Sequence, residues 1–261
     1  MRLGSNNYYG MILSHGMRRV TNPQALKDVH PEYYALYAGE RNTVKRKANQ
    51  CLSSAGLLEE TVRFCRTLYD VYDVQTVSVM PSDGYSTVCQ CPLCKDKGTL
   101  ERGREGWISD YVWEWTNRVA KELYKTHPDR YVSNFAYGTY KLPPENIDKL
   151  SPNVVVGIVH GRQSRELNPQ RAEELQELRQ KWLDISSNKL VIWINYPQMR
   201  RGEYRPCYWP HVTARSIRNT KGQSQGEYSW LPEANGVDVP GVNHLSAYMY
   251  LRYLWDADQD I

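Results

Sequence analysis

Phenylalanine is almost missing from this chain, which has 2 Phe against 20 Tyr and 8 Trp in 261 residues. Nearly every aromatic ring therefore carries a hydrogen-bonding group. Such rings suit a wet apolar cleft, where a ring face stacks and a ring edge donates. Long hydrophobic runs are also missing, since no segment approaches the roughly 18 apolar residues that cross a membrane. The sequence thus predicts no membrane span.

An excess of one charge is missing as well, because 33 basic and 29 acidic side chains leave a net charge of +4. A nucleic-acid-binding surface needs a basic stripe, which these mixed charges do not supply, so we expect no nucleic-acid partner. Residues 1–16 lack the apolar segment and the small-residue cleavage site of a signal peptide. No low-complexity or Gly/Ser-rich linker divides the chain, which favours a single domain over residues 1–261.

Helical and strand patterns alternate along the chain. Helices are predicted at 57–70, at 110–125 after an N-cap at Ser109, from Asn168-Pro169 to Trp182, at 209–221 and at 245–256. Strands are predicted at 74–80, 130–140, 153–161, 189–197 and 222–230, with an earlier one at 8–13. Alternation of this kind, with nearly continuous apolar strands, indicates parallel strands covered on both faces.

Two α/β architectures fit this pattern, a doubly wound sheet and a (β/α)8 barrel. A complete barrel needs eight strands in about 250 residues. About six strands are found here, and residues 14–56 hold no clear strand–helix unit. We therefore expect a TIM-barrel-type fold that is incomplete at its N-terminus.

Several motifs recur in a set order: HPEYYALYAGER (30–41), QCLSS (50–54), MPSDGYSTVCQCPLC (80–94), YVSNFAYGTYKLPP (131–144), SPNVVVGIV (151–159) and YLRYLWDADQD (250–260). Together they resemble the bacterial domain of unknown function 4838, and the likeness runs from about residue 8 to the end. The resemblance implies a glycoside-hydrolase-like TIM barrel acting on complex polysaccharide. It also implies a part of a longer, secreted or periplasmic protein, whose other domains would be its partners.

Working residues of TIM-barrel enzymes lie at the C-terminal ends of the strands and in the loops that follow. Glycosidic cleavage usually needs two carboxyl groups, one as acid and one as base or nucleophile, and no cofactor. The strand ends offer Asp83 and Glu227 as this pair. Five further polar or aromatic residues at strand ends are candidate substrate contacts: His15, Tyr137, His160, Asn195 and Trp230.

Simpler interpretations stand beside these. Asp83-Gly84 is also a turn-forming pair, and Glu227 could be a solvated carboxylate at an uncertain strand end. His160 could be a satisfied histidine at the barrel rim. The alternative function is a non-catalytic carbohydrate-binding or scaffold barrel, which would keep the aromatic residues without a working carboxylate pair.

Cysteines form a dense cluster after the 74–80 strand. Cys89, Cys91 and Cys94 give a CxC followed by a CxxC, and QCLSS adds Cys51. Four thiolates can bind a structural zinc, although a second close pair is missing. In a secreted enzyme the same residues could form two disulfides, with three possible pairings. The sequence leaves zinc and disulfides as alternatives for this cluster.

Overall fold

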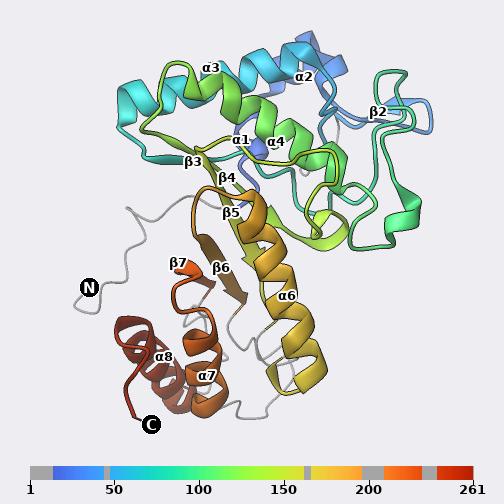
Figure 1. Ribbon diagram of the computed structural model, residues 1–261. Helices are drawn as coiled ribbons and strands as arrows, with labels where there is room; N and C mark the ends of the chain where they lie inside the picture. Colours follow the sequence, from blue (N-terminus) through green and yellow to red (C-terminus); the bar gives the residue numbers. More distant parts are fainter. Residues whose placement is uncertain (1–13, 44–47, 162–165, 196–208, 231–239, 261) are drawn as a thin grey trace. The chain divides into compact units, whose positions relative to one another are not determined.

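The computed structural model describes residues 14–43, 48–161, 166–195, 209–230 and 240–260. These residues form two compact units, coloured along the chain in Figure 1. The N-terminal unit contains residues up to 157 together with 181–188, and the C-terminal unit contains 158–180 and the residues from 189 onward. The strand predicted at 8–13 lies outside the described residues.

The N-terminal unit begins with short elements instead of a strand–helix repeat. They are α1 (Met17–Thr21), α2 (Gln24–Val29), the 3-10 turn η1 (Pro31–Tyr33), β1 (Leu36–Tyr37) and β2 (Glu40–Arg41). β1 and β2 form an antiparallel hairpin, and its turn residues Ala38 and Gly39 have φ of +49° and +86°. Two positive φ angles in succession are typical of the tight turn that joins hairpin strands. No strand–helix unit is therefore present between residues 14 and 43 or 48 and 56.

Two long helices, α3 (Ala55–Tyr72) and α4 (Ser109–Tyr124), pack against each other in this unit. Ser54 caps α3, since its side chain accepts a hydrogen bond from Leu57 N at 3.3 Å. Ser109 does not cap α4 as expected. Its backbone N–H already donates to the Gly106 carbonyl at 2.9 Å, so the preceding turn draws Ser109 into the helix and leaves Ile108 as the N-cap.

The parallel strands of the N-terminal unit are β3 (Thr76–Ser78), β4 (Tyr131–Ala136) and the first part of β5 (Val154–Val159). A short 3-10 turn, η3 (Gly138–Tyr140), follows β4, and another, η2 (Leu100–Arg102), precedes α4. β3 runs parallel to β4, with Ser78 opposite Ser133. β4 and β5 are buried along almost their whole length, which explains their continuous apolar sequences.

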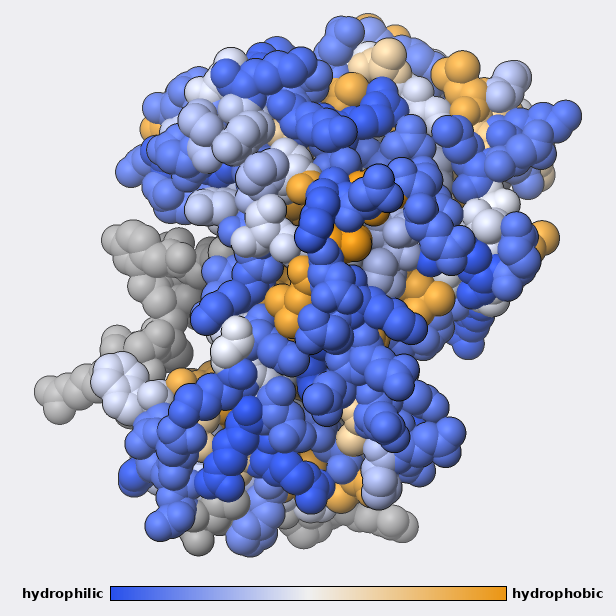
Figure 2. All heavy atoms as spheres, in the orientation of Figure 1, coloured by the Kyte–Doolittle hydropathy of each residue, from blue (hydrophilic) through white to orange (hydrophobic). Residues whose placement is uncertain are grey.

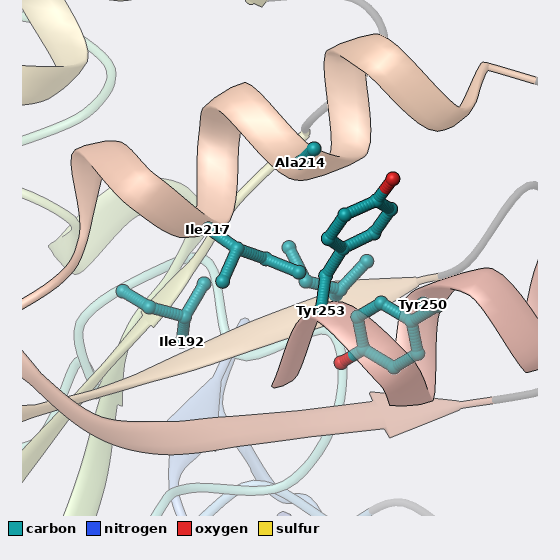
Figure 3. Packing of buried hydrophobic residues seen from close by; sticks show 6 residues of the cluster. Ile192, Ala214, Ile217, Tyr250 and Tyr253 are labelled. Carbon is teal, nitrogen blue, oxygen red and sulfur yellow. The ribbon is translucent and has the colours of Figure 1, made fainter. Parts of the chain in front are cut away.

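The C-terminal unit continues the alternation with α6 (Pro169–Ile185), β6 (Leu190–Asn195), α7 (Pro210–Asn219), β7 (Ser224–Trp230) and α8 (Pro240–Trp255). α6 passes into the N-terminal unit at residue 181. β6 and β7 are parallel. Their core is shown in Figure 3, where Ile217 of α7 and Tyr250 and Tyr253 of α8 meet Ile192 of β6.

Five strands are hydrogen-bonded in the order β3-β4-β5-β6-β7, which is also their order along the chain. The predicted α/β class and each of the five strands between 74 and 230 are confirmed. The remaining described strands, β1 and β2, form a separate two-stranded sheet. The described residues thus contain five of the roughly six strands that the sequence predicts, and the incomplete TIM-barrel architecture stays an expectation.

Hydrophilic side chains dominate the face of the molecule shown in Figure 2, and hydrophobic residues occur on it in small groups. Among the described residues, no helix combines the length and the apolar character that spanning a membrane requires.

Candidate functional site

Three of the predicted site residues, His15, Asp83 and Tyr137, meet in the N-terminal unit. Tyr137 directly follows β4, and Asp83 lies five positions after the end of the neighbouring strand β3. His15 comes two residues before α1. Because β3 and β4 are parallel, their C-terminal ends lie at the same edge of the sheet, as the rule for TIM-barrel sites requires.

His15 and Asp83 form the polar centre of this site. His15 Nε2 lies 3.6 Å from Asp83 Oδ1, and the two side chains are 18% and 38% exposed. The other ring nitrogen, Nδ1, lies 2.8 Å from the Pro81 carbonyl oxygen. A carbonyl only accepts hydrogen bonds, so Nδ1 carries a proton and Nε2 is the nitrogen that faces the Asp83 carboxylate.

A close backbone approach fixes His15. At the next residue, Gly16, a Cβ would lie 1.7 Å from the Ser78 carbonyl oxygen, so only glycine fits against the end of β3. Met17 N then donates to the Met80 carbonyl at 3.1 Å. His15 itself has a φ of +28°, a region that non-glycine residues seldom adopt. Such a backbone persists only where its surroundings enforce it.

A buried amide, Gln50, holds the loop just before Asp83. The two protons of its Nε2 are shared among three acceptors, Thr21 Oγ1, the Ala48 carbonyl and Ser82 Oγ, which lie at 2.8–2.9 Å. Its Oε1 accepts from Ser82 N at 3.3 Å. Because the side chain is fully buried, these bonds fix Ser82, and with it the position of Asp83.

Tyr137 adds an exposed aromatic ring to the site. It is 37% exposed and meets His15 edge to face, with ring centroids 6.3 Å apart. Tyr140 packs behind it in the same manner at 6.4 Å and is 1% exposed. Burial is the main cause that raises the pKa of Tyr140 well above its ordinary value, and the nearby Tyr137 and Asp83 raise it further. Tyr140 is thus a neutral support, and Tyr137 presents its ring to solvent.

In the C-terminal unit, Glu227 is half-buried and lies in the middle of β7, opposite Ile192 of β6. The expectation that it ends its strand is wrong, because β7 continues to Trp230. Its Oε2 accepts a hydrogen bond from Tyr250 Oη of α8 at 2.8 Å. Glu227 and Asp83 belong to different units, so their action as a pair stays a prediction.

His160 directly follows β5 and is paired with Glu166, a residue that the strand-end rule did not select. His160 Nε2 lies 3.1 Å from Glu166 Oε1, and the side chains are 0% and 2% exposed. Arg215 donates to the Glu166 carbonyl at 3.0 Å, and the buried Arg179 lies near enough to act on the Glu166 charge. One signal in the sequence could have identified Glu166: it is an acidic residue that follows shortly after an apolar strand and its histidine, His160. The role of His160 as a substrate contact stays a prediction.

Asn195 and Trp230 are the last residues of β6 and β7 and lie directly opposite each other in the register. Their places at the strand ends agree with the sequence prediction, and their roles as substrate contacts stay predictions.

Cys51, Cys89, Cys91 and Cys94 come together in the N-terminal unit. All four are buried and free, and their sulfur atoms lie within 4.8 Å of one another. Cys51 Sγ is 3.6 Å from Cys91 Sγ and 3.5 Å from Cys94 Sγ, and Cys91 and Cys94 are 3.6 Å apart. Hydrogen bonds from Cys51 and Cys89 hold the pKa of the Cys94 thiol well below its ordinary value. This arrangement could hold a metal ion.

Comparisons with known proteins match residues 2–261 to one family, described as a domain of unknown function (DUF4838). No curated protein matches. Solved structures with similarity include two of the GH36 alpha-galactosidase AgaA from Geobacillus stearothermophilus. The complex with raffinose is 8% identical in sequence to this chain, with a TM-score of 0.40. The complex with stachyose is 9% identical, with a TM-score of 0.41. Each match covers 88% of this chain and 29% of the galactosidase, so the chain spans less than a third of that protein's length. The match over almost all residues shows that this chain belongs to the family of the domain of unknown function 4838.

Proposed function

We propose that this chain is a carbohydrate-active, glycoside-hydrolase-like domain in which Asp83 is an acid–base group. The observation that carries this proposal is the meeting of Asp83, His15 and Tyr137 at the C-terminal ends of the parallel strands β3 and β4. A carboxylate beside an exposed aromatic ring suits a sugar, whose apolar face stacks and whose hydroxyl groups take polar hydrogen bonds.

Asp83 would exchange the proton, with His15 as its neighbour. The proton on His15 Nδ1 is committed to the Pro81 carbonyl, so Nε2 is the ring nitrogen that faces the carboxylate, 3.6 Å away. Asp83 is 38% exposed and can reach a bound ligand. A group placed in this way can protonate a leaving oxygen or accept a proton from an attacking water.

Hydrolysis needs a second carboxyl group. Glu227 is our candidate, since Tyr250 Oη orients its carboxylate with a hydrogen bond at 2.8 Å. Asn195 and Trp230, the last residues of β6 and β7, would be substrate contacts beside Glu227. From the family resemblance we also propose that this chain is part of a longer protein of polysaccharide-degrading bacteria, and that this protein is secreted or periplasmic.

Binding without hydrolysis is the second candidate function. One observation favours it: Glu227 lies inside β7, away from the strand end at which TIM-barrel enzymes usually place catalytic groups. In this case Asp83 and Tyr137 would contact a sugar that is not cleaved.

A pair of matched variants tests the proposal. Asp83→Asn should lower kcat on a responsive glycan by about 10²- to 10⁴-fold, which is the usual contribution of general acid–base catalysis. Asp96→Asn, the same change at an exposed position of the same loop, should leave turnover unchanged. Activity would be measured on a panel of polysaccharides, with circular dichroism to verify folding.

Tyr137→Ala should raise KM more than it lowers kcat, because the ring would contribute stacking with the substrate. Undiminished turnover in Asp83→Asn would remove Asp83 from the mechanism. If the wild type binds glycans and cleaves none, and Asp83→Asn or Tyr137→Ala weakens that binding, the binding function replaces hydrolysis.

A further inference from the structure

We propose that Cys51, Cys89, Cys91 and Cys94 bind one structural Zn²⁺ ion. The inference rests on the four free, buried thiols whose sulfur atoms all lie within 4.8 Å of one another. It is independent of the proposed carbohydrate function.

The spacing of the sulfur atoms is that of a tetrahedral metal site. A Zn–S bond of about 2.3 Å gives a tetrahedron whose corners lie about 3.8 Å apart. The distances from Cys51 to Cys91 and Cys94, and between Cys91 and Cys94, are 3.5–3.6 Å. Shifts of a few tenths of an ångström would therefore bring these atoms to zinc-binding geometry. A bridged pair of sulfurs would stand at about 2.05 Å, far closer than any of these.

The backbone around the ligands forms the tight turns that such a site needs. Cys94 N and Lys95 N both donate to the Cys91 carbonyl, at 2.9 and 3.1 Å. The chain therefore reverses between Cys91 and Cys94, and both thiols face the same point. Cys51 reaches that point from the turn before α3, where its carbonyl accepts from Ser54 N at 3.0 Å.

Hydrogen-bond donors surround the sulfur atoms. Leu36 N and Cys91 N donate to Cys89 Sγ at 3.3 and 3.4 Å. Tyr111 Oη lies 3.1 Å from Cys94 Sγ. Four thiolates and one Zn²⁺ carry a net charge of −2, and outer hydrogen bonds of this kind stabilise that charge and orient the ligands.

The site would have a structural role. Its four ligands fill every position of a tetrahedral ion, which leaves none open for a water or a substrate. Residues 79–99 connect β3 to η2 without regular secondary structure. An irregular segment of this length in a compact unit is uncommon unless something holds it. The metal would tie this segment, which also carries Asp83, to the start of α3.

Metal analysis of the full chain, purified without added metals or chelators, tests the proposal. We expect one equivalent of zinc, and Cys94→Ser should lose it. Cys65→Ser is the matched control, because Cys65 is buried in α3 outside the cluster, and burial raises its pKa to about 12. This variant should keep its zinc.

Wild-type protein supplies a test that does not depend on how the variants fold. Organomercurial titration should release zinc in step with the modification of four thiols. Cobalt added to the metal-free protein should give the intense visible and sulfur-to-metal charge-transfer bands of a tetrahedral thiolate site. Substoichiometric zinc with freely alkylated cysteines, iron in its place, disulfides in non-reducing mass spectra, or zinc retained by Cys94→Ser would each overturn the assignment.

Discussion

His160 Nε2 and Glu166 Oε1 lie 3.1 Å apart in the C-terminal unit, with 0% and 2% of their side chains exposed. Burial alone would raise the pKa of Glu166. The hydrogen bond and charge of His160, together with Arg179, outweigh burial and hold this pKa below its ordinary value. The carboxylate therefore stays ionised inside the protein and depends on its partners.

Removing the charge of Glu166 should be costly. Glu166→Gln leaves His160 and Arg179 without their buried anion, and breaking such a pair typically costs about 3–5 kcal/mol. The free energy of unfolding from urea titration measures this loss. The control is Glu32→Gln, because Glu32 Oε1 also lies 2.9 Å from a histidine nitrogen, His30 Nδ1. This pair is exposed, with 53% of the Glu32 side chain and 41% of the His30 side chain accessible. That variant should lose about 0–1 kcal/mol, and equal losses in the two variants would contradict the burial argument.

The same carboxylate predicts a dependence of stability on pH. The folded-state pKa of Glu166 lies below the ordinary value of 4.5, so the folded chain binds its proton less readily than the unfolded chain. Its contribution is complete above about pH 4.5 and is lost as the pH falls through the folded-state pKa. Urea midpoints would be measured above and below about pH 4.5. As the pH is lowered, the midpoint should decrease more in the wild type than in Glu166→Gln. Parallel curves would show that other carboxyl groups cause the acid loss.

Gly16→Ala should disturb both stability and the proposed site. A Cβ at this position would lie 1.7 Å from the Ser78 carbonyl oxygen, so α1 and His15 must move away from β3. We expect a loss of about 1–3 kcal/mol, as overpacking usually causes, and a decrease in kcat on any responsive glycan. Gly103→Ala is the comparison, since φ is +66° there but no atom lies within 4 Å of the added Cβ. It should cost about 1–2 kcal/mol through backbone strain alone and leave kcat unchanged.

Hydrophobic periodicity predicted much of the fold. The pattern at 57–70 became α3, and the apolar run at 189–197 became β6 at 190–195. Element boundaries were less accurate where local hydrogen bonds decide them. Ser109 has the chemistry of an N-cap, but the Gly106 carbonyl places it inside the helix. The family resemblance based on six separate motifs is confirmed by the match over residues 2–261.

The strand-end rule selected His15, Asp83 and Tyr137, which the structure brings together. It failed for Glu227, because β7 ends at Trp230, as the predicted strand at 222–230 does, and Glu227 lies three residues before that end. Glu166 and Tyr250 were missed, since each acts through a partner far away in the sequence or across a loop. The closeness of Cys51 to the other three cysteines followed from the family motif and not from local spacing.

Gln50 links residues that are far apart along the chain, and this has a consequence for folding. Its side chain joins Thr21, 29 positions earlier, to Ser82, 32 positions later, and His15 contacts Pro81 across 66 positions. Forming such contacts costs a large loop-closure entropy, because long stretches of chain must be brought together. The hydrogen bonds of α3 and α4 join residues that are close in the sequence and avoid this cost. The helices are therefore expected to form first, and the arrangement of His15 and Asp83 to be among the last features of the N-terminal unit to appear.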